Sequence, residues 1–206
     1  MSARLPVGVI GVGALGRHHA RHLAQSVDAR LVGVHDIDWD RGRDVAASVG
    51  TTFFEDVEAL LQQVEAVTVA VPTPVHAEVG LLALDRGKAV LMEKPLAASL
   101  ADADALIRSA EKNGVPLQVG HIERFNRAIR AARPYLGVVR YFESTRMAPF
   151  QPRGTDVAVI LDLMIHDLDL VLHLSRSARP SDVRASGVAV LSPHVDIANA
   201  RVEVET

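Results

Sequence analysis

The chain has 206 residues, of which 49% are hydrophobic and 23% charged, enough for the core of one large domain or two small ones. A net charge of −3 supplies no basic excess for nucleic acid, and the absence of cysteine excludes disulfides and thiolate metal sites. The sequence shows no signal-peptide pattern and no apolar run long enough to span a bilayer. We therefore expect a cytoplasmic protein that binds neither nucleic acid nor membranes.

Short apolar segments alternate with helical patterns through the first part of the chain. Strands are predicted at Leu5–Ile10, Arg30–His35, Thr51–Phe54, Ala66–Val71, Lys88–Met92 and Pro116–Gly120. Helices are predicted at Leu15–Gln25, Arg41–Val49, Val57–Gln63, Ala77–Arg86 and Leu100–Asn113. Strands that are apolar on both faces and separated by helices indicate an α/β fold with a doubly wound parallel sheet. Residues 1–120 are predicted to form this first domain.

From residue 121 the pattern changes to a mixture of helices and strands. The predicted elements are helices at Asn126–Ala132 and Val157–Leu174 and strands at Val138–Met147, Val183–Leu191 and Ile197–Glu205. This order predicts a second, α+β domain at 121–206 with an open mixed sheet. Because so few strands make a marginal sheet, and nothing closes the last one, we expect this domain to be incomplete.

A glycine-rich loop follows the first predicted strand. Gly11, Gly13 and Gly16 have the spacing G-x-G-x-x-G and open the first predicted helix. In this setting the first glycine allows a tight turn, the second lets the backbone approach a pyrophosphate, and the third lets the helix pack closely on the strand. The helix N-terminus also favours the phosphate charge. The spacing and its setting predict the dinucleotide-binding loop of a Rossmann domain.

An acidic residue follows the second predicted strand. Asp36 comes 20 residues after Gly16, where a carboxylate suits the two ribose hydroxyls of NAD and repels a 2′-phosphate. We therefore predict NAD as the cofactor. Arg41 and Arg43 lie nearby in the sequence, so NADP remains a second possibility.

Histidines crowd the first predicted helix. His18 and His22 are four residues apart and could share a metal ion, but the sequence shows no third ligand. A surface or packing role for these two residues and for His19 is therefore favoured.

Four polar residues interrupt the apolar helix predicted at Val157–Leu174. Asp162, His166, Asp169 and His173 fall within roughly 60° of arc at about 100° per residue. A buried polar stripe needs partners, so it either faces a cavity or forms an internal network. Ligation of a metal by Asp162, His166 and His173 is a third interpretation.

The segment "LMEKPL" ends an apolar strand with two opposite charges and a proline. Lys94 follows the strand, and ligands of an open parallel sheet bind beyond the carboxyl ends of its strands. Pro95 restricts the residue before it, which favours a fixed ammonium group that stabilises a substrate oxyanion. The alternative is a surface ion pair between Glu93 and Lys94.

Together these motifs resemble the glucose–fructose oxidoreductase, inositol dehydrogenase and rhizopine-catabolism (Gfo/Idh/MocA) family. The resemblance rests on "GVIGVGALGRHHA", on Asp36, on "VAVPTPVHAEVGLLALDRGKAVLMEKPLA" and on "LDLMIHDLDLV", in this order along the chain. "QVGHIERFNRA" further resembles the subgroup of UDP-N-acetylglucosamine 3-dehydrogenases and related nucleotide-sugar oxidoreductases. Members of the family are longer than this chain, so the resemblance also implies a C-terminally truncated member.

The resemblance implies a role for particular residues. Lys94, Asp162 and His166 would be catalytic, with His166 as the general base, Asp162 as its orienting group or a substrate ligand, and Lys94 polarising the reacting oxygen. The implied cofactor-binding residues are Gly11, Gly13, Ala14, Leu15, Gly16, Asp36, Thr73, Pro74, His76, Glu93 and Lys94. The implied substrate-binding residues are His121, Arg124, Asn126 and Asp162, and no metal is implied.

The family resemblance predicts an NAD-dependent oxidoreductase that moves hydride between nicotinamide and a secondary hydroxyl of a sugar or nucleotide sugar. The 3-hydroxyl of UDP-N-acetylglucosamine is the candidate substrate group. It also implies a homo-oligomer, a dimer or tetramer formed through the open sheet. The alternatives are a non-catalytic dinucleotide-binding protein, or a truncated inactive relative, and a metal-dependent hydrolase that uses the histidine helix.

Overall fold

The computed structural model describes residues 3–149, 158–175 and 179–205. The chain divides into two compact units, Met1–Gly120 and His121–Thr206. Among the described residues, no helix combines the length and the apolar character needed to cross a membrane.

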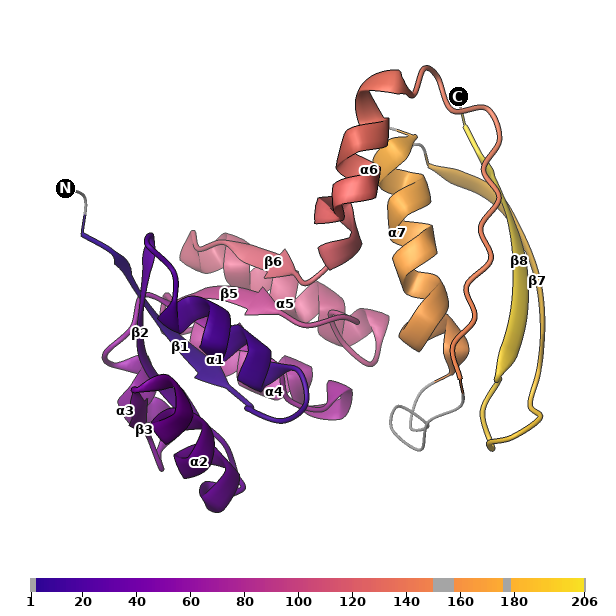
Figure 1. Ribbon diagram of the computed structural model, residues 1–206. Helices are drawn as coiled ribbons and strands as arrows, with labels where there is room; N and C mark the ends of the chain where they lie inside the picture. Colours follow the sequence, from indigo (N-terminus) through magenta and orange to yellow (C-terminus); the bar gives the residue numbers. More distant parts are fainter. Residues whose placement is uncertain (1–2, 150–157, 176–178, 206) are drawn as a thin grey trace. The chain divides into compact units, whose positions relative to one another are not determined.

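A parallel sheet of six strands forms the centre of the first unit (Figure 1). Its strands are β1 (Leu5–Ile10), β2 (Ala29–His35), β3 (Thr52–Phe53), β4 (Ala66–Val69), β5 (Ala89–Met92) and β6 (Leu117–Val119). Their order across the sheet is β3-β2-β1-β4-β5-β6, so the direction of winding reverses between β1 and β4. This order is that of a doubly wound dinucleotide-binding sheet, which confirms the predicted fold class.

Helices cover both faces of this sheet (Figure 1). They are α1 (Gly16–Ala24), α2 (Trp39–Val49), α3 (Val57–Leu61), the short 3₁₀ turn η1 (Thr73–Val75), α4 (His76–Leu84) and α5 (Leu100–Asn113). One apolar cluster joins α1 and α2 to the sheet through Val9, Ala20 and Ala46. A second joins α3, α4 and α5 to it through residues such as Leu60, Leu84 and Leu106. The strands therefore bury both faces, as their continuous apolar runs predicted.

The register of the central strands sets the edge at which their loops emerge. Ile10 of β1 pairs with Val69 of β4, and Val69 pairs with Met92 of β5. The loop after β1 and the turn after β5 therefore leave the sheet at the same carboxyl edge, separated by only one strand. In open sheets of this kind, that edge binds ligands.

The second unit combines helical segments with a two-stranded antiparallel sheet. Its helical elements are the 3₁₀ turn η2 (Ile122–Phe125), α6 (Arg127–Ala132), the 3₁₀ turn η3 (Arg133–Tyr135), the π-helical turn η4 (Ile160–Met164) and α7 (Ile165–Leu174). Strands β7 (Pro180–Val188) and β8 (Ile197–Val204) form the sheet. The predicted helix at Val157–Leu174 is thus a π turn followed by an α-helix, and its first residue lies outside the described ranges.

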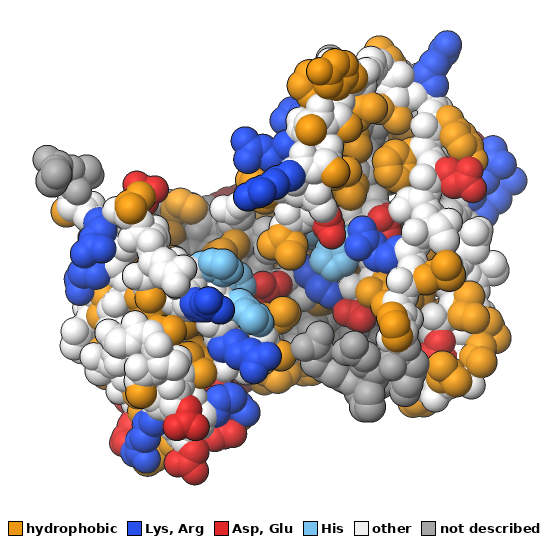
Figure 2. Space-filling view, in the orientation of Figure 1, with side chains coloured by type: hydrophobic (Ala, Val, Ile, Leu, Met, Phe, Trp, Pro, Cys, Tyr) orange, Lys and Arg blue, Asp and Glu red, His pale blue; other side chains and the backbone are white. Residues whose placement is uncertain are grey.

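One predicted strand of the second unit is wrong. Val138–Met147 forms no regular strand and pairs with no other strand in the described part of the chain. Several of its large side chains are exposed, including Val138, Tyr141 and Met147. In the space-filling view, hydrophobic side chains lie widely over the second unit (Figure 2). An apolar alternation predicts a strand only where a partner supplies backbone hydrogen bonds.

Candidate dinucleotide site

Three glycines shape the loop between β1 and α1. Gly11 has a φ of 82°, which L side chains rarely adopt, and a Cβ there would lie 2.8 Å from the carbonyl oxygen of Ala70. A Cβ on Gly16 would lie only 1.8 Å from the carbonyl oxygen of Gly11. At Gly13, by contrast, no described atom comes within 4 Å of such a Cβ. The loop is tightly packed at both ends and open in the middle.

The N-terminus of α1 has no side chain that caps it. Leu15 occupies the cap position without a side-chain hydrogen bond, and the first turn holds no acidic residue. In α2 and α5, Asp38 and Ser99 occupy the equivalent position and accept a backbone N–H. The N–H groups of Arg17 and His18 donate to the carbonyl oxygens of Gly13 and Leu15, at 3.3 and 2.9 Å. An anion such as phosphate therefore suits the opening before Arg17, where the helix dipole is positive. Ala14 and Leu15, predicted to bind the cofactor, lie at this opening.

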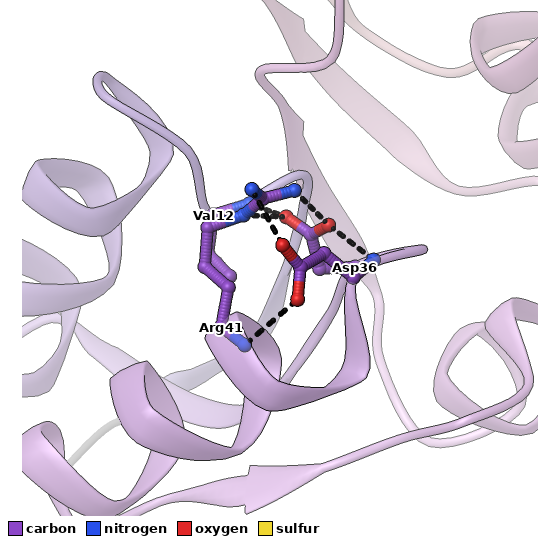
Figure 3. A network of polar contacts seen from close by, with 4 residues as sticks. Val12, Asp36 and Arg41 are labelled. Atoms are coloured by element: carbon purple, nitrogen blue, oxygen red, sulfur yellow. Dashed lines mark hydrogen bonds and ion pairs between the residues drawn. The ribbon is translucent and has the colours of Figure 1, made fainter.

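Asp36 lies at the end of β2, where a polar network holds its carboxylate (Figure 3). Its oxygens accept hydrogen bonds from the backbone N–H groups of Val12, at 2.8 Å, and Asp38, at 2.9 Å. The guanidinium of Arg41 donates to both oxygens, at 3.2 and 2.7 Å, and also pairs with Asp38 at 2.9 Å. Asp36 is 4% exposed, whereas the side chain of Arg41 is 43% exposed. The network ties the glycine loop to the end of the second strand.

The charge on Asp36 is stabilised within this network. Burial raises the pKa of the carboxyl group, but hydrogen bonds from Arg41, Asp38 and Val12 and the positive charge of Arg41 outweigh it, so the pKa lies below the usual value. Asp36 is therefore an anion at neutral pH. Any hydroxyl that binds it must share the carboxylate with Arg41 or displace that exposed side chain.

Glu93, Lys94 and Pro95 form the turn that follows β5. The peptide bond between Lys94 and Pro95 is cis. The backbone N–H of Glu93 donates to the carbonyl of Val69 at 3.0 Å, which extends the ladder to the edge of the sheet. Nε2 of His19, on α1, lies 2.6 Å from Oε1 of Glu93. The carboxylate of Glu93 is therefore held from the neighbouring helix, and Lys94 follows it directly.

Thr73, Pro74 and His76, also predicted to bind the cofactor, follow β4 at the same edge of the sheet. Thr73 and Pro74 begin the 3₁₀ turn η1, and Pro74 is exposed. His76 is 1% exposed, and its ring nitrogens lie 2.8 Å from the carbonyl oxygen of Pro95 and 3.0 Å from that of Val71. Because the ring is enclosed and bonded to the backbone, His76 braces the turn. Its contact with a cofactor stays a prediction.

In the second unit, Asp162 and His166 lie close together in the sequence but in different types of helix. Asp162 is in the π turn η4, and His166 is the second residue of α7. Both are half-buried. A π turn has more residues per turn than an α-helix, so the uniform 100° spacing expected for the polar stripe does not hold at Asp162. Such turns are frequent at functional sites.

Asp169, from the same stripe, forms an internal ion pair. Its carboxylate, which is 7% exposed, accepts hydrogen bonds from Nε and Nη2 of Arg124, the first at 2.8 Å. His121 Nε2 lies 3.7 Å from the same carboxylate, and its Nδ1 is buried with no hydrogen-bond partner among the described residues. Burial lowers the pKa of His121, as does the charge of Arg124, against the opposing effect of Asp169. The structure thus favours the internal-network interpretation for Asp169.

Asn126, the remaining predicted substrate residue, caps a helix. Its side-chain oxygen accepts the N–H of Ala128 at 3.0 Å, and its amide nitrogen donates to Glu123. The metal interpretations receive no support from the geometry, since no group of three His, Asp or Glu side chains in the described ranges could hold a metal ion.

A profile described as the oxidoreductase family with an NAD-binding Rossmann fold, Gfo/Idh/MocA, matches residues 5–121. The chain belongs to the Gfo/Idh/MocA oxidoreductase family. It is 45% identical over 194 residues to UDP-N-acetylglucosamine 3-dehydrogenase of Acidithiobacillus ferrooxidans, covering 94% of this chain and 61% of that protein. It is 38% identical over 178 residues to inositol 2-dehydrogenase of Rubrobacter xylanophilus, covering 82% of this chain and 51% of that protein.

A solved structure has the same fold as this chain. The crystal form P212121 of UDP-N-acetylglucosamine 3-dehydrogenase GnnA from Acidithiobacillus ferrooxidans matches with a TM-score of 0.92 and 43% identity, over 98% of this chain and 67% of that one. The chain thus spans about three fifths of the length of the first curated relative. The expected family membership, with its fold, is confirmed.

The loop geometry fits the dinucleotide expected of this Gfo/Idh/MocA member. Gly13 leaves open space beside the uncapped start of α1, and the anionic Asp36 lies at the end of the next strand. Sequence reasoning predicted these residues but missed two contacts that hold them, from Arg41 to Asp36 and from His19 to Glu93. Arg41 lies five residues after Asp36, so the sequence placed the two close together without indicating the bond. The pairing of His19 with Glu93, 74 residues apart, had none.

Proposed function

We propose that this chain is an NAD-dependent dehydrogenase that transfers hydride between nicotinamide and a secondary hydroxyl of a sugar or nucleotide sugar. The observation that carries the proposal is the shared edge of the sheet. The glycine loop after β1 and the Lys94 turn after β5 leave the sheet at the same edge, and only β4 lies between the two strands. Membership of the oxidoreductase family supports the same reaction class.

Bound NAD would supply a nicotinamide ring that takes up or gives back hydride. The chain's own contribution begins with holding the cofactor. The backbone at Gly13 and the positive N-terminus of α1 would bind the diphosphate, and Asp36 would accept hydrogen bonds from the ribose hydroxyls. Thr73 and Pro74 would line the cofactor from the turn after β4.

The proposed chemistry needs a base and a cation at the reacting hydroxyl. His166 would take the hydroxyl proton as the carbon loses hydride, a role for which imidazole is the most common side chain. Lys94 would donate a hydrogen bond to the same oxygen and stabilise the negative charge that develops on it. Asp162 would orient His166 or bind the substrate.

The contacts of Asp36 support NAD over NADP. A buried anion beside the ribose repels a 2′-phosphate, although Arg41 offsets part of that charge. As substrate we propose a nucleotide sugar, with UDP-N-acetylglucosamine as the first candidate, because a relative of that name is 45% identical. His121, Arg124 and Asn126 would lie near the sugar or its phosphates. Asp169 already engages Arg124, so we expect diphosphate binding through the remaining donors of that guanidinium.

Steady-state turnover tests the proposal. The wild-type chain is expected to reduce NAD in the presence of UDP-N-acetylglucosamine. The variants Lys94→Ala and His166→Ala should lower kcat by about 100- to 10,000-fold, the range for loss of an acid–base group, with little change in NAD affinity. His173→Ala, on the same helix, is the matched control and should retain activity. NAD binding without oxidation of any sugar would favour a non-catalytic dinucleotide-binding protein instead.

A further inference from the structure

The contact between His19 and Glu93 joins two parts of the first unit that the sequence separates by 74 residues. His19 lies on α1, the helix that begins at the glycine loop, and Glu93 follows β5. The side chains are 23% and 12% exposed, and Nε2 of the ring lies 2.6 Å from Oε1 of the carboxylate. A carboxylate only accepts hydrogen bonds, so the ring nitrogen donates. A charge that is so little exposed needs such partners.

The second oxygen of Glu93 is enclosed from two other directions. Oε2 accepts the backbone N–H of Lys94 at 3.3 Å. On the side of β6, a Cβ added to Gly120 would lie 3.2 Å from the same oxygen, closer than most real contacts of that type. Helix α1, the turn after β5 and the end of β6 therefore meet around one carboxylate. A side chain at position 120 would have to displace that carboxylate by a few tenths of an ångström.

The three histidines of α1 are not equivalent. His18 and His22 are exposed, whereas His19 is half-buried against Glu93. In the space-filling view, histidine side chains that are visible lie beside Lys and Arg side chains (Figure 2). A solvated surface therefore accounts for His18 and His22 but not for His19.

We propose that His19 is a positioning residue, which holds the carboxylate of Glu93 and, through it, the backbone of Lys94. The same helix starts at the cofactor loop, so one rigid element sets the place of both the dinucleotide and the lysine. The inference rests on the role proposed for Lys94. It gives Glu93 a role in supporting Lys94, since one oxygen accepts from His19 and the other from the backbone of Lys94. The acceptor sites that remain on the carboxylate are compatible with the cofactor contact predicted for Glu93.

Replacement of His19 tests this role against a purely structural one. His19→Leu removes the donor and should lower kcat by about 10- to 100-fold, the effect of a catalytic group displaced by up to an ångström, while NAD affinity stays near that of wild type. His19→Gln keeps an N–H donor at a similar reach and should restore most of kcat. His18→Leu, on the exposed side of the helix, is the control. Full activity in His19→Leu, or no recovery in His19→Gln, would overturn the proposal.

Two further variants extend the test, and the second of them does not depend on turnover. Gly120→Ala pushes on the same carboxylate from β6 without touching His19, so it should also lower kcat more than NAD affinity. In thermal unfolding, the double variant His19→Leu/Glu93→Leu should lose less than the summed shifts in Tm of the two single variants. Additive shifts would contradict the pairing. A wild-type chain that oxidises no sugar but shows this coupling would instead count against the proposed function alone.

Discussion

Gly13 and Gly16 lie three residues apart in one loop, yet their surroundings differ. No described atom lies within 4 Å of a Cβ at Gly13, whereas one at Gly16 would collide with the carbonyl of Gly11. We predict that Gly13→Ala leaves Tm close to that of wild type but weakens NAD binding. Gly16→Ala should lower the free energy of unfolding by about 1–3 kcal/mol, as overpacking does. Calorimetry on both variants checks this, and equal Tm values for the two would contradict a loop that is packed at Gly16 and open at Gly13.

Arg41 is expected to set the balance between the two nicotinamide cofactors. It is bonded to both oxygens of Asp36, and more than a third of its side chain is exposed, so it can also meet a 2′-phosphate. Arg41→Ala should leave the NAD dissociation constant little changed or lower. The same substitution should raise the NADP dissociation constant by about 10-fold or more, which corresponds to the loss of one charge-assisted hydrogen bond. Titration calorimetry measures the binding of NAD and NADP to this variant, and Arg43→Ala is the control. Equal losses for NAD and NADP would count against this role.

Glu93 should make stability depend on pH in the acid range. Burial raises its pKa, but the hydrogen bond and charge of His19, together with Lys94, lower it by more. The unfolded chain then binds the proton more tightly than the folded one, so the stabilisation is present above the usual glutamate pKa and is lost as pH falls towards the folded value. Glu93→Gln should therefore flatten the fall in unfolding free energy below about pH 4.5. Denaturant melts from pH 3 to 7 measure it, and an unchanged slope in the variant would show that Glu93 does not contribute.

At the scale of elements, the first unit was predictable because its signals are local. All six of its strands were predicted, with Leu5–Ile10 matching at both ends, since strands buried on both faces are continuous apolar runs bounded by turns. The segment Val138–Met147 has a similar pattern but no partner among the described strands, and pairing is not a local property. The sequence also did not indicate the π turn at Ile160–Met164, because apolar residues lie on both sides of it.

The residues of the candidate site also differ in how local their sequence signals are. Gly11, Gly13, Gly16 and Asp36 follow from spacing alone, because the backbone geometry of a dinucleotide loop fixes it. The supports of the site, His19 and His76, depend on contacts between distant segments. The sequence suggested a surface or packing role for His19 and a cofactor contact for His76, and it contains nothing that indicates their actual neighbours.

The ion pair of Arg124 with Asp169 should anchor α7, the helix that carries His166. Asp169 is nearly inaccessible and η2 supplies its partner, so Arg124→Leu would leave a buried carboxylate without its main donor. We expect a loss of about 1–3 kcal/mol in the free energy of unfolding. Arg124→Leu/Asp169→Leu should recover part of that loss, and Arg130→Leu on α6 is the exposed control. Urea melts of the wild type and the three variants test the ion pair. If Arg124→Leu is as stable as the wild type, an anchoring role is excluded.

At the scale of the whole molecule, the second unit exposes apolar side chains on its two-stranded sheet, β7 and β8. Val183 of β7 and Ile197 of β8 are about as exposed as surface polar residues, at 59% and 60%. Exposed strands with apolar side chains favour association, so we propose a homo-oligomer formed through this sheet. Sedimentation equilibrium of the wild type and of Val183→Glu/Ile197→Glu tests it, with a lower mass expected for the variant. A monomeric wild type would contradict the proposal.

The proposed function depends on the transfer of hydride from a sugar carbon to the cofactor. UDP-N-acetylglucosamine that carries deuterium on C3 of the sugar, mixed with NAD and the wild-type chain, tests it in a single turnover. We predict that the deuterium appears in the reduced nicotinamide, with release of one proton to solvent and formation of a 3-keto sugar. Loss of the label to water, or no reduction with this or any other sugar that the chain binds, would contradict the dehydrogenase assignment.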